Sequence, residues 1–189
     1  LEIAHEIEGA TKDIYLTYGI KTTAGSRVLA DYIPSYDATS VARLKKAGAV
    51  IVGKTNMDAW AHGSSGENSD FGSTKNPYNV EYVPGGSSSG SAAALAASMC
   101  LAATGTDTGG SIRLPASFCN LVGLKPTYGR VSRYGIIAMA TSLDSIGHLS
   151  KNIYDCALIL SITAGFDGFD ATCPNVDVPP YHQRLKTGV

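Results

Sequence analysis

The sequence has no excess of charge of either sign. Its 15 Lys and Arg residues are matched by 16 Asp and Glu residues, which leaves a formal net charge of -1 at pH 7. Domains that bind nucleic acid directly usually carry a clear basic surplus. We therefore expect no direct nucleic-acid binding by this chain, and any RNA contact is expected to come through a partner or a missing segment.

Cysteine is scarce and has no metal-binding spacing. No C-x-x-C pair occurs, and no Cys/His cluster has the spacing of a zinc site. Cys100 and Cys119 lie in apolar runs, where buried free thiols are common. We expect no metal site in this chain, and we expect a reducing compartment. The bacterial-type cytoplasm is the expected location, with an organellar matrix as the alternative.

Long apolar runs are also absent. The longest, residues 92–104, is rich in alanine and shorter than the ~18–20 residues that cross a bilayer. A chain of 189 residues that is 44% hydrophobic suits one globular domain with a real core. Residues 1–173 are expected to form that domain, truncated at both ends. Residues 174–189, where Pro, Asn and Asp gather, are expected to form a surface connection to a missing C-terminal part.

Residues 37–47 have the apolar spacing of an amphipathic helix. Val41 and Leu44 are predicted to face the core, Arg43 is predicted to face solvent, and Asp37 can cap the start of the helix.

An α/β fold is indicated by what surrounds this helix. Residues 49–52 read as a short buried strand directly after it. Residues 91–104 read as a buried helix, and residues 152–164 as a third helix. We predict a mixed β-sheet flanked by α-helices on both faces, with the Gly/Ser-rich loops 62–73, 84–91 and 105–111 meeting at one sheet edge.

One motif has the letters of a phosphate-binding loop without its context. Residues 48–55 satisfy G-x-x-x-x-G-K-[ST]. That chemistry needs a loop whose backbone N–H groups turn toward phosphates. Here a helix precedes, and the middle residues are apolar strand formers, so Lys54 is interpreted as following a core strand.

A second motif, residues 86–90, satisfies the nucleophile-elbow pattern G-x-S-x-G with Ser88 at its centre. Such hydrolases need a later acid and then a histidine, on a strand-turn-helix frame. Only His148 and His182 follow, and Pro84-Gly85 interrupts a strand before the turn. We therefore prefer another serine as the nucleophile.

The serines that carry the chemistry are Ser87 and Ser111, which lie 24 positions apart. Their surroundings are Val83-Pro-Gly-Gly-Ser-Ser-Ser-Gly-Ser-Ala-Ala-Ala94 and Gly105-Thr-Asp-Thr-Gly-Gly-Ser-Ile-Arg-Leu-Pro-Ala116. Upstream, the pair Lys12-Asp13 lies 75 positions before Ser87, counted from Lys12. In these motifs and their spacing the chain resembles the amidase signature family over nearly its whole length.

The resemblance implies a catalytic core in residues 1–173 that hydrolyses amides. It implies Ser111 as nucleophile, Ser87 as proton relay after a cis Gly86–Ser87 peptide, and Lys12 as general base. It also implies an oxyanion hole built from backbone N–H groups of residues 108–111, which are Thr108, Gly109, Gly110 and Ser111.

The residues support this chemistry independently. A serine hydroxyl needs a base at neutral pH, and none of the four histidines is suitably placed. A lysine can serve if burial keeps it neutral. Asp107 and Arg113 are interpreted as a structural pair that holds the Ser111 loop, because buried charges are usually paired.

Further segments, residues 19–26, 53–58, 122–133 and 142–147, resemble one branch of the family. Members of that branch hydrolyse glutamine and pass the ammonia to a partner that converts Glu-tRNA(Gln) to Gln-tRNA(Gln). This implies B and C subunits of an amidotransferase as partners, in a heterotrimer, with ATP and Mg²⁺ on one of those partners. It implies no cofactor in this chain, no membrane contact and tRNA contact only through the complex.

Three positions depart from the branch pattern, namely Ala59-Trp60, His62 and Ser89. They border the expected acyl pocket, and they put fine substrate specificity in doubt, not the reaction type. The segment that would hold the glutamine α-amino and α-carboxylate groups is expected beyond Val189. A free-standing amidase of small amides and a non-catalytic structural fragment are the alternatives.

Overall fold

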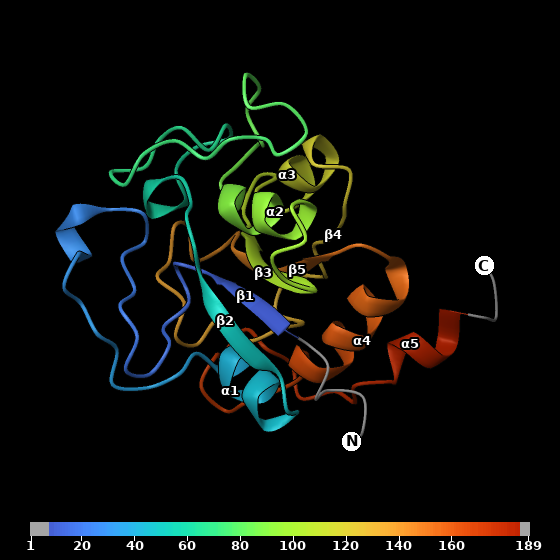
Figure 1. The fold of residues 1–189 in the computed structure, drawn as a ribbon. Helices are drawn as coiled ribbons and strands as arrows, with labels where there is room; N and C mark the ends of the chain where they lie inside the picture. The colour runs from blue at the N-terminus through green and yellow to red at the C-terminus, as the bar shows by residue number, and fades with distance from the viewer. Residues whose placement is uncertain (1–7, 186–189) are drawn as a thin grey trace.

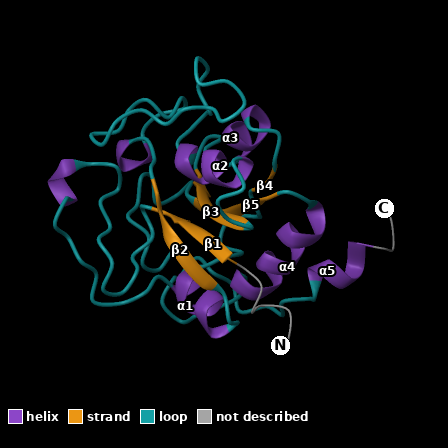
Figure 2. Cartoon of the chain, viewed as in Figure 1, coloured by secondary structure: helices purple, strands orange, loops and turns teal. Residues whose placement is uncertain are grey.

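The computed structural model describes residues 8–185, which form a five-stranded mixed β-sheet with helices on both faces (Figures 1 and 2). The strands are β1 (Glu8–Lys12), β2 (Val50–Thr55), β3 (Ala102–Asp107), β4 (Val122–Leu124) and β5 (Ser145–Ser150). The helices are α1 (Thr39–Lys46), α2 (Ser89–Ala96), α3 (Arg113–Phe118), α4 (Ile153–Thr163) and α5 (Tyr181–Arg184), with short 3₁₀ turns at Arg27–Leu29 and Ala59–Ala61. The predicted fold class is confirmed.

The sheet order is β2-β1-β3-β5-β4. Strand β1 pairs in parallel with both β2 and β3, while β5 pairs antiparallel with β3 and β4. Parallel neighbours end at the same side of a sheet, so the chain leaves β1, β2 and β3 on one side. The Gly/Ser-rich loops meet at this end of the strands, beside the central strands β1 and β3, and not along an outer strand.

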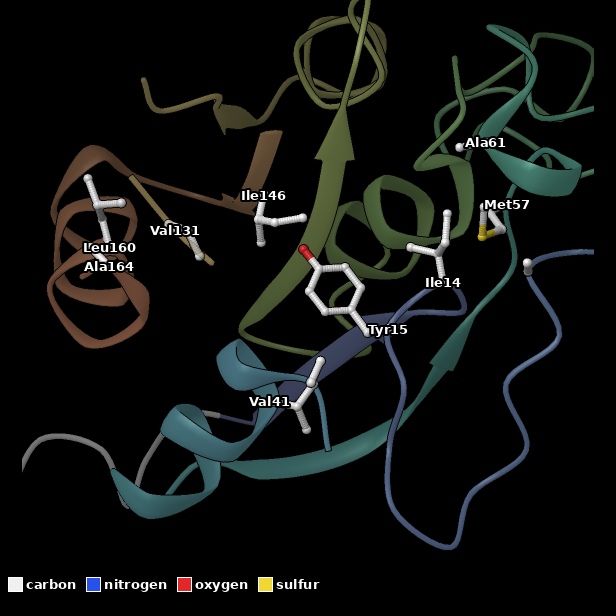
Figure 3. Packing of buried hydrophobic residues seen from close by; sticks show 11 residues of the cluster. Ile14, Tyr15, Val41, Met57, Ala61, Val131, Ile146, Leu160 and Ala164 are labelled. Atoms are coloured by element: carbon white, nitrogen blue, oxygen red, sulfur yellow. The ribbon is translucent and has the colours of Figure 1, made fainter. Parts of the chain in front are cut away.

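Two apolar layers enclose the sheet. Helices α2 and α3 cover one face and α1 and α4 the other (Figure 1). One cluster joins α2 and α3 to the sheet through Leu95, Ile112 and Leu149. In the other, Tyr15 lies between Val41 and Ile146 (Figure 3). This packing fixes the end of β1, where the candidate site begins.

The helix predicted over residues 37–47 is present as α1, with Val41 and Leu44 buried. Two details differ from the prediction. The first concerns Asp37, which does not cap the helix: its carboxylate accepts hydrogen bonds from the Tyr18 N–H and the Lys45 ammonium instead.

The second detail is that Arg43 does not simply face solvent. Its guanidinium donates hydrogen bonds to four consecutive carbonyls that end or follow α4, those of Thr163, Ala164, Gly165 and Phe166. The last carbonyls of a helix have no partner within it and carry partial negative charge. Arg43 therefore caps α4 from the neighbouring helix α1.

The helix predicted over residues 91–104 is wrong beyond its first half. Helix α2 ends at Ala96, Ser98 adopts a left-handed φ of 60°, and strand β3 begins at Ala102. Both elements are alanine-rich, β3 is buried throughout, and no residue of α2 is exposed, so the run has no hydrophobic period that separates helix from strand. For the same reason the predicted loop 105–111 begins too early and includes the end of β3.

The strand predicted at residues 49–52 is β2, but it is not a buried strand. Within the described residues it pairs only with β1, and Val50 and Val52 are 56% and 49% exposed. An apolar run of this length does not reveal whether its strand is central or outer. The helix predicted at residues 152–164 is α4, which Asn152 caps by accepting a hydrogen bond from the Asp155 N–H.

The described part of the segment 174–189 contains helix α5, and residues 186–189 lie outside the described residues. Val178 and Tyr181 pack against the core cluster around Tyr15, and Arg130 donates a hydrogen bond to the Tyr181 hydroxyl. The role of this segment as a connection to further sequence stays a prediction.

Candidate active site

Lys12 is the last residue of β1, and its side chain is wholly buried. Its Nζ lies 2.8 Å from Ser87 Oγ and 2.8 Å from Thr106 Oγ1. The backbone N–H of Lys12 donates to Thr104 Oγ1 on the adjacent β3. The strand pair β1–β3 therefore delivers Lys12 to Ser87.

Burial changes the proton affinity of Lys12. Loss of hydration of the ammonium is the largest effect and lowers the pKa of Lys12 from 10.5 to about 7, although the charges of Asp58, Asp107 and Asp144 raise it. A substantial fraction of this lysine is consequently neutral near neutral pH, and a neutral amine can accept a proton.

The loop that carries Ser87 is clamped between backbone partners. The Gly86–Ser87 peptide is cis. The Gly86 N–H donates to the Ser64 carbonyl, and the Asp58 N–H donates to the Ser87 carbonyl. A Cβ on Gly86 would lie 2.0 Å from Asp58 Oδ2, so only glycine leaves room for the carboxylate beside this peptide.

Ser111 lies in the loop before α3. It is 8% exposed, and within residues 8–185 its hydroxyl has no hydrogen-bond partner. The two serine loops are joined by the Ser88 N–H, which donates to the Ser111 carbonyl at 3.1 Å. A direct hydrogen bond between the Ser87 and Ser111 hydroxyls is absent from the described residues.

Asp107 anchors the Ser111 loop. Its carboxylate accepts from the N–H groups of Gly110, Ile112 and Arg113 and from the Arg113 guanidinium, at 2.8 to 3.2 Å. Burial alone would raise the pKa of Asp107, but these hydrogen bonds and the Arg113 charge hold it below 3.8. The charged Asp107 carboxylate therefore holds the loop that contains Ser111 in place.

The backbone N–H groups expected to form an oxyanion hole are not all free. Those of Thr108, Gly109 and Ser111 have no acceptor among residues 8–185. The N–H of Gly110 differs from the expectation, because it donates to Asp107 Oδ1 at 2.8 Å. A donor already engaged by a carboxylate is poorly placed to serve an oxyanion, so Gly110 contributes a backbone φ of 137°, which glycine adopts readily, and not its N–H.

A cavity of about 160 Å³ opens in front of Ser111. Its lining comes from the Ser111 loop with Leu114, from the loop around Gly63, and from Met139. The lining is Ala61, Gly63, Ser64, Gly86, Thr108, Gly109, Gly110, Ser111, Leu114 and Met139. This cavity can admit the acyl part of a small amide next to an unpaired serine hydroxyl.

Three site residues are missing from the sequence prediction: Thr106, Asp58 and Asp144. Thr106 binds Lys12 directly. Asp58 accepts from the N–H groups of Gly66 and Asn68 and so holds one pocket wall. Both acids stand in segments that carry the resemblance, yet only the tertiary fold brings these carboxylates toward Lys12.

The two discounted motifs have structural explanations. Ser88 is wholly buried, and its hydroxyl donates to the Thr106 carbonyl at 3.4 Å. Lys54 belongs to β2, and its Nζ binds the Tyr15 carbonyl, Thr22 Oγ1 and the Asp13 carboxylate. Lys54 therefore holds the chain just after Lys12, and its surroundings are a strand and not a phosphate-binding loop.

The positions that depart from the branch pattern are not among the residues that line this cavity, although Ala61, between Trp60 and His62, is. Trp60 and Ala61 both adopt left-handed φ angles, of 56° and 61°, and Ala61 lines the cavity. His62 is exposed, whereas Ser89 is buried with its hydroxyl 3.1 Å from Thr74 Oγ1.

The described residues hold neither a cluster of metal ligands nor a membrane-spanning helix. Across residues 8–185, no three His, Cys, Asp or Glu side chains gather as metal ligands. Among the helices of the same range, none has the length and apolar character needed to cross a bilayer.

Known proteins resemble this chain closely in sequence. The A subunit of glutamyl-tRNA(Gln) amidotransferase from Syntrophus aciditrophicus (strain SB) is 58% identical over 180 residues, which cover 95% of this chain and 37% of that protein. The same subunit of Geobacter metallireducens is 60% identical over 180 residues, with the same shares of 95% and 37%. The chain thus spans a little over a third of the length of these relatives.

Solved structures share the fold. The crystal structure of the A subunit of glutamyl-tRNA(Gln) amidotransferase from Thermotoga maritima matches with a TM-score of 0.89 at 54% identity, over 90% of this chain and 38% of that one. Native peptide amidase from Stenotrophomonas maltophilia matches with a TM-score of 0.90 at 43% identity, over 95% of this chain and 38% of that one.

The Amidase family model matches residues 7–188. That range contains the buried lysine, both serine loops and the cavity between them. This chain belongs to the Amidase family.

Proposed function

We propose that this chain carries the catalytic half of an amidase site in which Ser111 is the nucleophile, Ser87 the relay and Lys12 the base. The observation that carries the proposal is the 2.8 Å contact between a buried Lys12 and Ser87, next to a cavity that an unpaired Ser111 hydroxyl lines. In this proposal the proton passes from the Ser111 hydroxyl through the Ser87 hydroxyl to the neutral lysine.

In the first step, neutral Lys12 takes a proton from Ser87 while Ser87 takes one from Ser111. The Ser111 oxygen attacks the amide carbon and forms a tetrahedral oxyanion. The free N–H groups of Thr108, Gly109 and Ser111 can stabilise that charge. The Ser87–Ser111 hydrogen bond forms when substrate binds, as catalytic hydrogen bonds often tighten only in the complex.

In the second step, the proton on Lys12 returns through Ser87 to the amide nitrogen. The carbon–nitrogen bond breaks, ammonia leaves, and an acyl ester remains on Ser111. Water then attacks the ester with the same groups acting as base and acid, which releases the carboxylic acid and restores the enzyme.

We further propose that the amide is glutamine and that the ammonia serves conversion of Glu-tRNA(Gln) to Gln-tRNA(Gln). Identity of 58% and 60% to two A subunits supports this proposal. Under this proposal, the full polypeptide works with B and C subunits in a heterotrimer in the cytoplasm. ATP and Mg²⁺ would bind a partner, and tRNA would be reached only through the complex.

A free-standing amidase is the second candidate. Peptide amidase matches the fold as well as the Thermotoga maritima protein does, though at the lower identity of 43%. The lining of the Ser111 cavity is compatible with either substrate, because it holds only the acyl side of the site.

The test compares substrates in the full-length polypeptide, alone and with B and C subunits. Ammonia release should be faster from glutamine than from simple primary amides, and it should rise when the partners, ATP and Glu-tRNA(Gln) are present. Faster hydrolysis of peptide amides, with no response to partners, would favour the second candidate. Absence of any hydrolysis and of Ser111 labelling would reject an amidase site.

A further inference from the structure

Asp144 is a buried carboxylate in the turn that precedes β5, with 4% of its surface exposed. Its Oδ1 accepts a hydrogen bond from Thr108 Oγ1 at 2.6 Å. Its oxygens also accept from the N–H groups of Met139 at 2.9 Å and Ala140 at 3.0 and 3.2 Å. The Asp144 N–H donates back to the Ala140 carbonyl, so the turn and the carboxylate form one rigid unit.

These contacts join two segments that line one cavity. Thr108 begins the loop that presents Ser111, and both Thr108 and Met139 line that cavity. The two segments are separated by α3 and β4 in the chain. Apart from Thr108, each group that donates to Asp144 belongs to its own turn, so the Thr108 hydroxyl is the link that reaches the Ser111 loop.

The peptide group after Thr108 depends on the Thr108–Asp144 hydrogen bond for its position. Asp107 already holds the far side of the loop through Gly110, Ile112 and Arg113. On the near side, the N–H groups of Thr108 and Gly109 have no acceptor in residues 8–185, so no backbone hydrogen bond fixes their direction. Among the described residues, the hydrogen bond of the Thr108 side chain is the one that ties these two residues to another segment.

We propose that Asp144 is a positioning residue for amide hydrolysis: through Thr108 it aims the free N–H groups of the Ser111 loop at the cavity and sets their distance from Met139. This proposal rests on the proposed function of Ser111. A displaced donor costs rate, since misplacement of about 1 Å can cost about 10²-fold. Asp144 therefore acts through Thr108 and does not touch the substrate itself.

Asp144 also bears on the charge balance of Lys12. The charged groups that face Lys12 are Asp58 from the loop after β2, Asp107 at the end of β3, and Asp144 before β5. Asp107 is paired with Arg113, and Arg133, near Asp144, is engaged by Asp170. The negative charge of Asp144 favours the protonated form of Lys12, so its removal should make Lys12 easier to deprotonate.

The test uses the full-length enzyme with its partner subunits and glutamine as substrate. Thr108→Val removes the hydroxyl, whereas Thr108→Ser keeps it and is the matched control. We expect kcat to fall about 10- to 100-fold in Thr108→Val with little change in KM. Complete loss of one oxyanion donor typically lowers kcat by about 10²-fold or more, and a donor that is only misdirected should cost less. Thr108→Ser, which keeps the hydroxyl, should recover most of the kcat that Thr108→Val loses.

Asp144 is varied in two ways. Asp144→Ala should lower kcat as Thr108→Val does, and the double variant should be no worse than the more damaged single variant, because both remove the same link. Asp144→Asn keeps an acceptor oxygen but removes the charge, and it should move the acidic limb of the kcat/KM profile to lower pH. Asp31→Asn, at an exposed ion pair, should leave that limb in place.

Several results would overturn the proposal. Full activity of Thr108→Val, multiplied effects in the double variant, or a change in KM alone would each show that the Asp144–Thr108 bond does not position the donors. If Asp144→Ala fails to fold, the comparison of Thr108→Val with Thr108→Ser still tests the proposal. A wild type that neither hydrolyses amides nor labels at Ser111 rejects the proposed function as well, whereas an active wild type with an unaffected Thr108→Val rejects this inference alone.

Discussion

At the scale of single residues, Lys12 combines a buried side chain with a hydroxyl partner on each of two segments. Burial lowers its pKa to about 7 despite three nearby carboxylates, and its Nζ touches Ser87 at 2.8 Å. Because the neutral form is the base, the rate should rise with pH through about 7 and reach a plateau above it.

The first prediction concerns this acidic limb. In the full-length enzyme, kcat/KM should fall about tenfold per pH unit below the pKa of Lys12, as the neutral fraction does. Lys12→Ala should remove the limb together with most of the activity. Lys12→Arg should fail too, because a guanidinium stays protonated. An active Lys12→Arg enzyme with an unchanged profile would make Lys12 a structural cation.

The second prediction separates the serines. Ser111→Ala should lower the rate of amide hydrolysis by about 10³-fold or more, since losing one member of a catalytic group that acts as a unit removes most of its effect. It should also block covalent labelling by a sulfonyl fluoride, measured by mass spectrometry of the labelled peptide. Ser88→Ala is the control, because Ser88 is wholly buried and bonded to a carbonyl. Label found on Ser88 in the Ser111→Ala protein would support the nucleophile elbow instead.

At the scale of elements, the close approach of helices to the sheet depends on glycines. Gly105 lies in β3, where a Cβ would meet Ile112 Cγ1 at 2.8 Å, Ser88 Oγ at 3.1 Å and Leu149 Cδ1 at 3.2 Å. Those neighbours come from both serine loops and from β5. Gly105 thus lets the two loops pack onto the strand that leads to Ser111.

The third prediction is that Gly105→Ala destabilises the full-length protein by about 1–3 kcal/mol, the usual cost of overpacking a well-filled core. Gly53→Ala is the matched control, because Gly53 is also in a strand and its Cβ would meet nothing within 4 Å. Chemical denaturation of both variants checks this. Equal denaturation midpoints for the two variants would show that β3 and its neighbours move apart with no loss of unfolding free energy.

At the scale of the whole molecule, the balance of 15 basic and 16 acidic residues sets what the protein can attract. Phosphate contacts by Lys and Arg supply most non-specific binding to nucleic acid, and they make it salt-dependent. A chain with a net charge of -1 has no surplus for such contacts.

The fourth prediction follows from this charge. The isolated 189-residue chain should show no salt-sensitive binding of tRNA in a filter-binding assay between about 50 and 200 mM salt, a range over which a protein with several phosphate contacts loses about 10³-fold or more in affinity. Its complex with B and C subunits should bind. Salt-sensitive binding by the polypeptide alone would mean that tRNA contacts lie on this polypeptide.

Patterns that act locally could be predicted from the sequence. The spacing of Val41 and Leu44 identified α1, Asn152 stands where α4 begins, and the two serine-containing loops with Lys12 pointed to the Amidase family. The fold class could also be predicted, because a chain in which helices and strands alternate can pack its apolar faces in only a few layered arrangements. The apolar run at residues 49–52 did not reveal that its strand is exposed, and the run at residues 91–104 has no hydrophobic period that separates helix from strand.

Only the tertiary structure decided which groups meet. Asp58, Asp107 and Asp144 lie far apart in the chain, yet all act on Lys12, and Arg43 caps a helix more than a hundred residues away (a separation of 120 to Thr163). Sequence determines the chemical groups and their local conformations. Distance, burial and the engagement of the Gly110 N–H by Asp107 arise when strands pack side by side, because hydration and hydrogen bonding depend on neighbours in space and not on neighbours in the chain.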